Sequence, residues 1–326
     1  MAAEKRYLGI DIGGTKCAVT IGDTEGRILR KERFPTEGPD KTVKHILDVA
    51  ELFLRESDVP VVSAGVSCGS PLDFERGIIL SPPNLPGWDH VEIVDELEKR
   101  LGIPAILEND ANACALAEWR FGAGRGTRHM IFLTFGTGMG AGIIIDGKIY
   151  NGANGNAGEV GHMRMERFGP IGYGKIGSYE GFASGGGIAM SARNLAIEQL
   201  QQGKSVGYCH SYAELETVTA KTVADAARAG DATAIEVYRL CGEMLGRGLS
   251  ILVDVLNPEC IVIGSVFQRA EDLLRKSMDA VMKRECLPFS YAAVRVVPAE
   301  LGDEIGDVAA LALAVAAEEK SFQKGE

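Results

Sequence analysis

Residues 103–121 read IPAILENDANACALAEWRF and predict a short buried strand that leads directly into a helix. The apolar run Ile103–Leu107 has the length of a strand, and Ala111–Phe121 carries its apolar positions at helical spacing behind an Asx residue. A carboxylate at such a turn is rigidly held, open to a ligand and close to helix N–H groups. Asp110 is therefore a candidate catalytic carboxylate, with a simple helix cap as the alternative.

The length and the charge of the chain limit the classes of protein to which it can belong. At 326 residues, with 46% hydrophobic and 24% charged residues, the chain is long enough for two lobes with ample cores. The formal net charge of −11 argues against nucleic acid as a partner, because phosphate backbones are bound by clustered Lys and Arg. No apolar run has membrane-spanning length, and the start MAAEKRY lacks the apolar core of a signal peptide.

The cysteines favour a reducing compartment. They are scattered, odd in number and never in CxxC spacing, which is typical of reduced core residues in a cytoplasmic protein. Their positions are Cys17, Cys68, Cys114, Cys209, Cys241, Cys260 and Cys286. We therefore expect a cytoplasmic location, with neither a membrane nor a nucleic acid as partner.

A glycine turn lies between the first two predicted strands. Residues 7–12, 17–21 and 28–34 predict three strands joined by short turns, which form an antiparallel meander. A dinucleotide-binding fold would instead place a helix directly after the turn. Glycines in Gly13-Gly14-Thr15-Lys16 let backbone N–H groups approach a phosphate, and Asp11 beside them is a candidate for a hydrated metal ion. An ordinary β-turn with a solvated Asp is the alternative.

A second glycine turn follows the predicted strand 128–135. Glycine occupies every second position from Gly136 to Gly142, and this spacing lets amides face a nucleotide tail. Residues 142–149 nearly match a Walker A loop, but Ile149 has no hydroxyl for magnesium and the residues between are strand formers. Asp146-Gly147 predicts a hairpin there instead.

The two glycine turns indicate an internal duplication. Each stands between strands, and each half also has an apolar strand ahead of a helix. We expect two α/β lobes, 1–110 plus about 303–326 and 111–302, with a cleft between them. Closure of such a cleft would exclude water, which competes with a sugar as phosphoryl acceptor.

Two polar loops are further candidates for a binding site. Glu159 and His162 lie in the glycine-rich turn GNAGEVGH, where a carboxylate and an imidazole can bracket neighbouring sugar hydroxyls. A plain surface turn is the alternative. The loop PNLPGW at 83–88 is rigid because of its prolines, and its Asn84 and Trp88 suit one wall of a sugar pocket as well as a structural crossover.

The remaining elements alternate between helices and strands. Helical spacing covers 41–56, 91–101, 188–202, 222–229, 232–256, 268–284 and 306–319, and apolar runs predict strands at 61–68, 260–265 and 293–298.

At these motifs the chain resembles the ROK family of sugar kinases and related repressors, within the actin-like ATPase superfamily. LGIDIGGTK at 8–16 and FGTGMGAG at 135–142 are similar to its two phosphate motifs, and ENDANA at 108–113 to its catalytic segment. GEVGH at 158–162 resembles the sugar-binding turn, and NPECIVIGS at 257–265 the strand beside the adenosine. The resemblance implies a two-lobed actin-like (ribonuclease H-like) fold with duplicated mixed β-sheets flanked by helices and a central cleft.

The resemblance also implies a role for each matching position. Asp110 would be the general base, and Asp11 would hold magnesium through water. The sugar ligands would be Asn84, Asn109, Asp110, Glu159, His162 and Glu180. The residues around ATP would be Asp11, Gly13, Gly14, Thr15, Lys16, Gly136, Thr137, Gly138 and Gly264.

One departure from the family concerns zinc. Zinc-binding members carry cysteines in a C-x-C-G-x-x-G-C-x-E pattern after the histidine, and this chain keeps the frame up to Glu180. Ile171, Tyr173 and Ser178 stand at the cysteine positions, so we expect no structural zinc. This leaves open what orients His162, and our hypothesis is that packing of Tyr173 and Tyr179 replaces the metal in fixing this loop.

These features together predict an ATP- and Mg²⁺-dependent hexose kinase that phosphorylates the primary hydroxyl of glucose, and the resemblance favours a homodimer. N-acetylmannosamine, N-acetylglucosamine or another hexose is the alternative substrate. A non-catalytic sugar-binding regulator is the alternative of another class, although Asp11, Asp110 and both glycine turns favour an enzyme. A repressor of the family would carry a helix-turn-helix ahead of Leu8, for which this sequence leaves no room.

Overall fold

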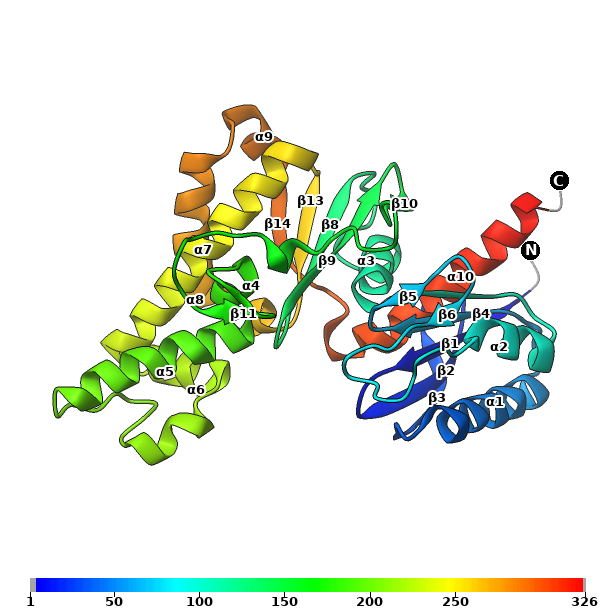
Figure 1. Cartoon of the computed structure of the whole chain (residues 1–326). Coiled ribbons are helices and arrows are strands. Elements are labelled where there is room, and N and C mark those ends of the chain that lie inside the picture. The colour runs from blue at the N-terminus through cyan, green and yellow to red at the C-terminus, as the bar shows by residue number, and fades with distance from the viewer. Residues whose placement is uncertain (1–3, 325–326) are drawn as a thin grey trace. The chain divides into compact units, whose positions relative to one another are not determined.

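A computed structural model of the chain describes residues 4–324 and divides into two compact units (Figure 1). Unit 1 contains the chain up to Gly126, residues Gly142–Ala157 and the chain from Glu300 onward. Unit 2 contains Thr127–Ala141 and Gly158–Ala299.

A five-stranded mixed sheet forms the centre of unit 1. Its order is β3-β2-β1-β4-β7, where β1 is Arg6–Ile12, β2 Lys16–Gly22, β3 Ile28–Pro35, β4 Val61–Cys68 and β7 Ala105–Asn109. The first three strands pair antiparallel, as the meander predicted, whereas β4 runs parallel to both β1 and β7. Parallel neighbours bring the carboxyl ends of β1, β4 and β7 to one edge of the sheet, and candidate site residues lie at the ends of β1 and β7.

Helices cover the sheet of unit 1. They are α1 (Pro39–Glu56), α2 (Ile93–Leu101), α3 (Asp110–Phe121) and α10 (Ile305–Lys324). The alanine-rich α10 lies against β1 and β4, and Figure 1 shows it running along them. The approach is close enough that a Cβ at Gly65 would lie 2.3 Å from the Ala310 carbonyl oxygen, so only glycine fits there. This contact sets the first turn of α10 over the end of β1.

The sheet of unit 2 repeats the mixed pattern. Its order is β10-β9-β8-β13-β14, where β8 is Met130–Phe135, β9 Met139–Ile145, β10 Lys148–Ile149, β13 Cys260–Ile263 and β14 Arg295–Pro298. The strand β13 is parallel to both β8 and β14, while β9 and β10 form an antiparallel hairpin. The division between the units falls within β9, so Gly142–Ile145 and β10 belong to unit 1. Duplicated mixed sheets flanked by helices confirm the predicted fold class.

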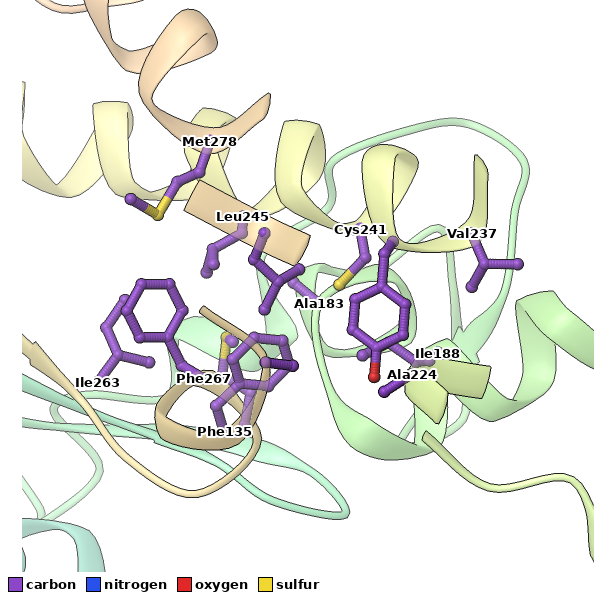
Figure 2. Close-up of a cluster of buried hydrophobic side chains, with 14 of the residues drawn as sticks. Phe135, Ala183, Ile188, Ala224, Val237, Cys241, Leu245, Ile263, Phe267 and Met278 are labelled. Carbon is purple, nitrogen blue, oxygen red and sulfur yellow. The ribbon is translucent and has the colours of Figure 1, made fainter. Parts of the chain in front are cut away.

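Helices surround a large apolar core in unit 2. They are α4 (Tyr179–Phe182), α5 (Gly185–Gln201), α6 (Ala220–Arg228), α7 (Ala232–Leu256), α8 (Val266–Glu285) and α9 (Pro288–Ala293). Figure 2 shows Leu245, Phe267 and Met278 among the side chains of this core, where all three are fully buried. The core fixes α4, α5 and the end of β8, which carry the unit's candidate residues.

Short elements complete the chain. They are β5 (Leu72–Asp73), β6 (Ile78–Ile79), β11 (Ile171–Gly172), β12 (Lys175–Ile176) and the 3-10 turns η1 (Val160–His162), η2 (Tyr212–Thr217) and η3 (Gly302–Glu304). The sequence did not predict α9, whose residues 288–293 precede a strand that we expected to begin at 293.

The predicted lobe boundaries differ from the division into units. Residues 111–126 and 142–157 lie in unit 1 because α3 packs against α10 in a shared apolar cluster. The predicted first lobe also included residues 1–3, 325 and 326, which lie outside the described residues.

Two further features concern the cysteines and the apolar character of the helices. All seven cysteines are free thiols, and only Cys114 is not buried. Within residues 4–324, no helix combines the length and the apolar character needed to cross a membrane.

Candidate functional site

The turn from β7 to α3 carries Asp110 as the first residue of the helix. The helix cap is Asn109, whose Oδ1 accepts hydrogen bonds from the N–H groups of Ala111 at 2.9 Å and Asn112 at 3.4 Å. Asp110 adds a second acceptor for Ala111, with Oδ1 at 2.8 Å from its nitrogen. Because Asn109 already caps the helix, the alternative that Asp110 serves as the cap is wrong.

The carboxyl of Asp110 is open to solvent on one side, and protein crowds it on the others. This burial raises its pKa, because the charged form loses hydration, and the Ala111 N–H and the Asn109 side chain offset only part of the effect. A carboxylate with a raised pKa is a better proton acceptor, which suits a general base.

A hydrogen-bond network holds this turn from behind. Glu108 Oε1 accepts from the Asn109 N–H at 2.9 Å and from Asn112 Nδ2 at 3.1 Å. Its Oε2 accepts from Asn151 Nδ2 at 2.9 Å, and Asn109 Nδ2 donates to Ser70 Oγ at 2.8 Å. The sequence analysis did not single out Ser70 or Asn151, and no sequence signal places either beside residue 109.

The end of β1 presents Asp11 among other carboxylates. Burial, Asp307 and Asp110 raise the pKa of Asp11 to about 6, although Arg33 and Lys31 partly oppose the shift. Asp307 is itself buried and forms ion pairs with Lys31 and, at 3.5 Å, with Arg33. Asp307 Oδ1 is buried and has no hydrogen-bond partner among the described residues. The two cations that pair with Oδ2 therefore balance only part of the negative charge of these carboxylates.

Asp11 by itself suits a contact with a hydrated divalent cation. Mg²⁺ is usually bound by one or two carboxylates and keeps several waters, so Asp11 beside a glycine turn is a sufficient donor set. A cation would also relieve the repulsion that raises the pKa of Asp11.

The first glycine turn is a tight hairpin. The Gly13 N–H donates to the Lys16 carbonyl oxygen at 3.1 Å, and the side chains of Thr15 and Lys16 are exposed. A Cβ at Gly14 would lie 2.5 Å from the Asn84 carbonyl oxygen, so the 83–88 loop packs directly on this turn. Asn84 is exposed there, but Trp88 is 1% exposed and belongs to the core. The interpretation of Trp88 as a pocket wall is therefore wrong.

The second glycine turn is shorter than predicted. Gly136 N–H donates to the Gly138 carbonyl oxygen at 3.1 Å, and β9 already begins at Met139. Gly140 and Gly142 are strand residues, so only Gly136-Thr137-Gly138 forms the turn. A Cβ at Gly142 would lie 2.4 Å from the Ala111 carbonyl oxygen, which explains that glycine by close packing.

Glu180 and the η1 turn pack around the start of β9. Glu180 Oε2 accepts a hydrogen bond from the Met139 N–H at 2.9 Å. A Cβ at Gly161 would lie 2.1 Å from the Met139 carbonyl oxygen, so the backbone of η1 lies against the same residue. Glu159 and His162 flank this buried glycine with exposed side chains, available to a ligand.

A cavity of about 620 Å³ lies within unit 2, next to the second glycine turn. Gly136 and Thr137 line it together with Gly185 and Gly186 at the start of α5. Four basic side chains also line it, namely Arg193, Lys221, Arg228 and Arg269. Ser265 reaches this cavity, whereas the predicted Gly264 does not line it. Its size and its basic lining suit a nucleotide.

The hairpin β11–β12 occupies the position of the family's cysteine loop. Tyr173 and Gly174 form its turn with φ angles of 44° and 74°. Lys175 Nζ donates to the His162 carbonyl oxygen at 2.6 Å, and an Arg164 N–H donates to the Ile176 carbonyl oxygen at 2.7 Å. Two cations thus tie the hairpin to the histidine turn.

The two tyrosines behave differently from each other. The Tyr173 ring lies edge-on to the His162 ring, with 6.4 Å between the ring centroids, but the Tyr173 side chain is 78% exposed. Tyr179 is fully buried, its hydroxyl donates to the Leu245 carbonyl oxygen at 2.9 Å, and its N–H donates to the Met163 carbonyl oxygen at 2.8 Å. Tyr179 thus anchors this end of the loop in the core, and replacement of the metal by tyrosine packing stays a prediction. Within residues 4–324, no three His, Cys, Asp or Glu side chains are grouped to hold a metal ion.

The predicted residues therefore gather in two sets. Unit 1 holds Asp11, Gly13, Gly14, Thr15, Lys16, Asn84, Asn109 and Asp110. Unit 2 holds Gly136, Thr137, Gly138, Glu159, His162, Glu180 and Gly264.

Comparisons with known proteins cover nearly the whole chain. A glucokinase from Halalkalibacterium halodurans is 33% identical over 331 residues, covering 99% of this chain and 98% of that protein. A ROK hexokinase structure from Thermus thermophilus aligns with a TM-score of 0.80 and 29% identity, over 97% of this chain and 99% of that one. A ROK family glucokinase from Streptomyces griseus, solved in complex with glucose and AMPPNP, aligns with a TM-score of 0.71 and 31% identity, over 95% and 99%. The ROK family model itself matches residues 7–317, and the chain therefore belongs to the ROK family.

Proposed function

We propose that the chain is an ATP-dependent kinase that transfers a phosphoryl group to the primary hydroxyl of glucose. The observation that carries this proposal is Asp110, a solvent-reachable carboxylate with a raised pKa, fixed at the first turn of a helix whose cap is a different residue. Relatives named glucokinase, at about one-third identity over almost the full length, support the choice of glucose.

In the proposed reaction, Asp110 accepts the proton of the sugar hydroxyl as that oxygen attacks the terminal phosphorus of ATP. The new bond joins the sugar oxygen to phosphorus, and the bond to the bridging oxygen of ADP breaks. Asn109 accepts from helix N–H groups through Oδ1 and donates from Nδ2 to Ser70, and its side chain also hydrogen-bonds the Asp110 carboxyl. The family resemblance supports its role as a sugar ligand beside the base.

The remaining sugar hydroxyls would be bound by Asn84, Glu159, His162 and Glu180. Glu159, His162 and Asn84 are exposed, and Glu180 has one carboxylate oxygen available, which supports this assignment. The amide of Asn84, the imidazole of His162 and the carboxylates of Glu159 and Glu180 can bind neighbouring sugar hydroxyls, because each hydroxyl both donates and accepts a hydrogen bond.

The glycine turns and the basic cavity would hold the nucleotide. The family resemblance assigns contacts with the phosphates to Gly13, Gly14, Thr15 and Lys16 and to Gly136, Thr137 and Gly138. Mg²⁺ held through water by Asp11 would neutralise charge on the transferring phosphoryl group. Backbone N–H groups at the turns would contribute to the same stabilisation.

A substrate panel tests the function directly. Turnover of glucose, mannose, galactose, N-acetylglucosamine and N-acetylmannosamine is measured by ADP release, with the phosphorylated position assigned by NMR. Glucose phosphorylated at its primary hydroxyl, with the highest kcat/KM of the panel, is the expected result. Preference for an N-acetylhexosamine would correct the substrate, and no turnover of any sugar would overturn the proposed activity.

Two further proposals concern the protein in the cell. We propose a homodimer in the cytoplasm, supported by the family resemblance and by the free cysteines. Light scattering of the purified protein measures its oligomeric state, and fractionation of the source cells locates it.

A further inference from the structure

Glu180 contacts the residue that ends the second glycine turn. It lies in the first turn of α4, and its Oε2 accepts the Met139 N–H at 2.9 Å. Met139 follows Gly138 directly, so this hydrogen bond fixes the point at which the turn becomes strand. A hydrogen bond to a charged acceptor is stronger than one between neutral groups.

The fit around this contact leaves no room for a side chain. A Cβ at Gly138 would lie 2.5 Å from Glu180 Oε2, and a Cβ at Gly161 would lie 3.2 Å from Glu180 Cβ. A side chain at residue 138 would therefore displace the Glu180 carboxylate that packs against Gly138. The glycine turn and the histidine turn meet at the same side chain.

The other side of the glycine turn is bonded to the start of α5. The Gly185 N–H donates to the Gly136 carbonyl oxygen at 2.7 Å, and the Gly186 N–H donates to the Thr137 carbonyl oxygen at 3.1 Å. These four residues line the 620 Å³ cavity. The turn is thus held between Glu180 and α5, both of which follow the histidine turn in the chain.

The two oxygens of Glu180 differ in what they bind. Oε2 is committed to Met139, whereas Oε1 accepts no hydrogen bond within the part of the chain that the structure describes. The side chain is half-buried, so Oε1 can still reach a ligand.

We propose that Glu180 is a positioning residue for the nucleotide as well as a ligand of the sugar. Through Oε2 it holds the Gly136–Gly138 turn in the form that binds phosphate, and through Oε1 it accepts a sugar hydroxyl. A sugar bound at Oε1 restrains the side chain and therefore the turn, so sugar and nucleotide each tighten the binding of the other. This inference rests on the proposed function and adds a link between the two substrates.

The test measures two affinities separately by calorimetry, that of AMPPNP with Mg²⁺ in the absence of sugar and that of glucose in the absence of nucleotide. Glu180→Ala should lower the affinity for AMPPNP and the affinity for glucose by about tenfold each, because it removes both contacts of the carboxylate. Glu180→Gln keeps an oxygen that accepts from Met139, so its AMPPNP affinity should stay within about twofold while its glucose affinity falls. Glu159→Ala is the matched control, with weakened glucose binding and unchanged AMPPNP binding.

The coupling is measured by repeating the AMPPNP titration at saturating glucose. In the unmodified protein, saturating glucose should raise the affinity for AMPPNP by about fivefold or more. In Glu180→Ala the same addition should raise it by less than about twofold. If Glu180→Ala does not fold, Glu180→Asp replaces it, because its shorter side chain cannot reach Met139.

Two results would overturn the inference: AMPPNP affinity that is unchanged in folded Glu180→Ala or Glu180→Asp, or an equal loss in Glu180→Gln and Glu180→Ala. Failure of the proposed function looks different, because the unmodified protein would then bind neither glucose nor AMPPNP.

Discussion

The carboxylates of unit 1 and those of unit 2 are held in opposite ways. Asp11 lies at the end of β1 and Asp110 follows β7, and burial raises the pKa of both carboxyls. The charges of Asp307 and Asp110 add to the shift of Asp11. Glu180 lies at the start of a short helix, and one of its carboxylate oxygens accepts a hydrogen bond from a backbone N–H. Glu159 is an exposed residue beside a 3-10 turn. Unit 1 thus concentrates carboxylates suited to proton and metal chemistry, and in unit 2 Glu180 holds the position of a turn.

The difference follows from the local backbone. Strand ends in a parallel sheet are rigid and adjacent, so side chains there are forced together whatever their charge. Residues in a glycine turn are not held by the hydrogen-bond ladder of a sheet, so their conformation depends on hydrogen bonds from neighbouring elements. This contrast predicts that substitutions in unit 1 act on chemistry and stability, and those in unit 2 on binding.

Replacing the proposed base is the strongest test of the contrast. Asp110→Asn keeps the size of the side chain and its contact with the Ala111 N–H, but it cannot accept a proton at neutral pH. We expect kcat to fall by about 10²–10⁴-fold while the affinity for glucose stays nearly unchanged. Steady-state kinetics and glucose titration measure the two effects, and near-normal turnover would remove Asp110 from the role of base.

Glu118 is an exception among the carboxylates of unit 1. It is fully buried, yet backbone N–H groups donate hydrogen bonds to its carboxylate. Its carboxylate accepts from Ala123 N–H at 2.8 Å and from Glu300 and Leu301 N–H, each at 3.0 Å. Glu118→Ala should lower the free energy of unfolding by about 3 kcal/mol or more, because several buried donors lose their acceptor.

Urea denaturation measures this loss, and Glu300→Ala is the matched control. Glu300 forms an exposed ion pair with Arg125, and its backbone N–H stays on Glu118 in the variant. The control should lose less than about 1 kcal/mol. Equal losses in the two variants would contradict the role of the buried carboxylate.

Neutralising Asp11 should stabilise unit 1 at neutral pH. Its pKa is about 6 in the folded protein against 3.8 for an ordinary Asp, so the folded state binds this proton more tightly than the unfolded state. The resulting stabilisation is complete below about pH 3.8 and is lost as pH rises through 6. Asp11→Asn should therefore be more stable than the unmodified protein at pH 7.5, on the order of 1–3 kcal/mol.

Urea denaturation from pH 4.5 to 7.5, with EDTA present to exclude cations, measures this difference. It should shrink as the pH falls below 6, because the unmodified side chain is then protonated. A variant that is less stable at pH 7.5, or a difference that does not change with pH, would contradict the assignment.

The smallest expected effect concerns the hairpin of unit 2. Lys175→Met removes the hydrogen bond to the His162 carbonyl oxygen and should raise the KM for glucose about fivefold with a smaller change in kcat. Lys175→Arg should restore most of the affinity, and Lys204→Met, at a remote lysine, should have no effect. Zinc analysis of the purified protein accompanies this test, and stoichiometric zinc would refute metal-free orientation of His162.

The order of elements was largely predictable from the sequence. The antiparallel meander, the strand-to-helix turn at 105–121 and the β9–β10 hairpin all follow from apolar spacing and glycine or Asx positions, which act over a few residues. The same patterns misplaced what depends on packing. Trp88 was a candidate for the wall of a pocket as much as for a structural crossover, and it is a core residue.

The sequence by itself determined which residue types stand at each turn, and therefore the family and the candidate base. Only the tertiary structure decided that Asn109 caps the helix ahead of Asp110, that Asp307 lies near Asp11, and that Glu180 bonds the Met139 N–H. The last two pairs are separated by 296 and 41 residues along the chain. Local patterns carry no information on such distances, because they are set by how sheets and helices pack, and packing also decides which polar groups lose water and must find a partner.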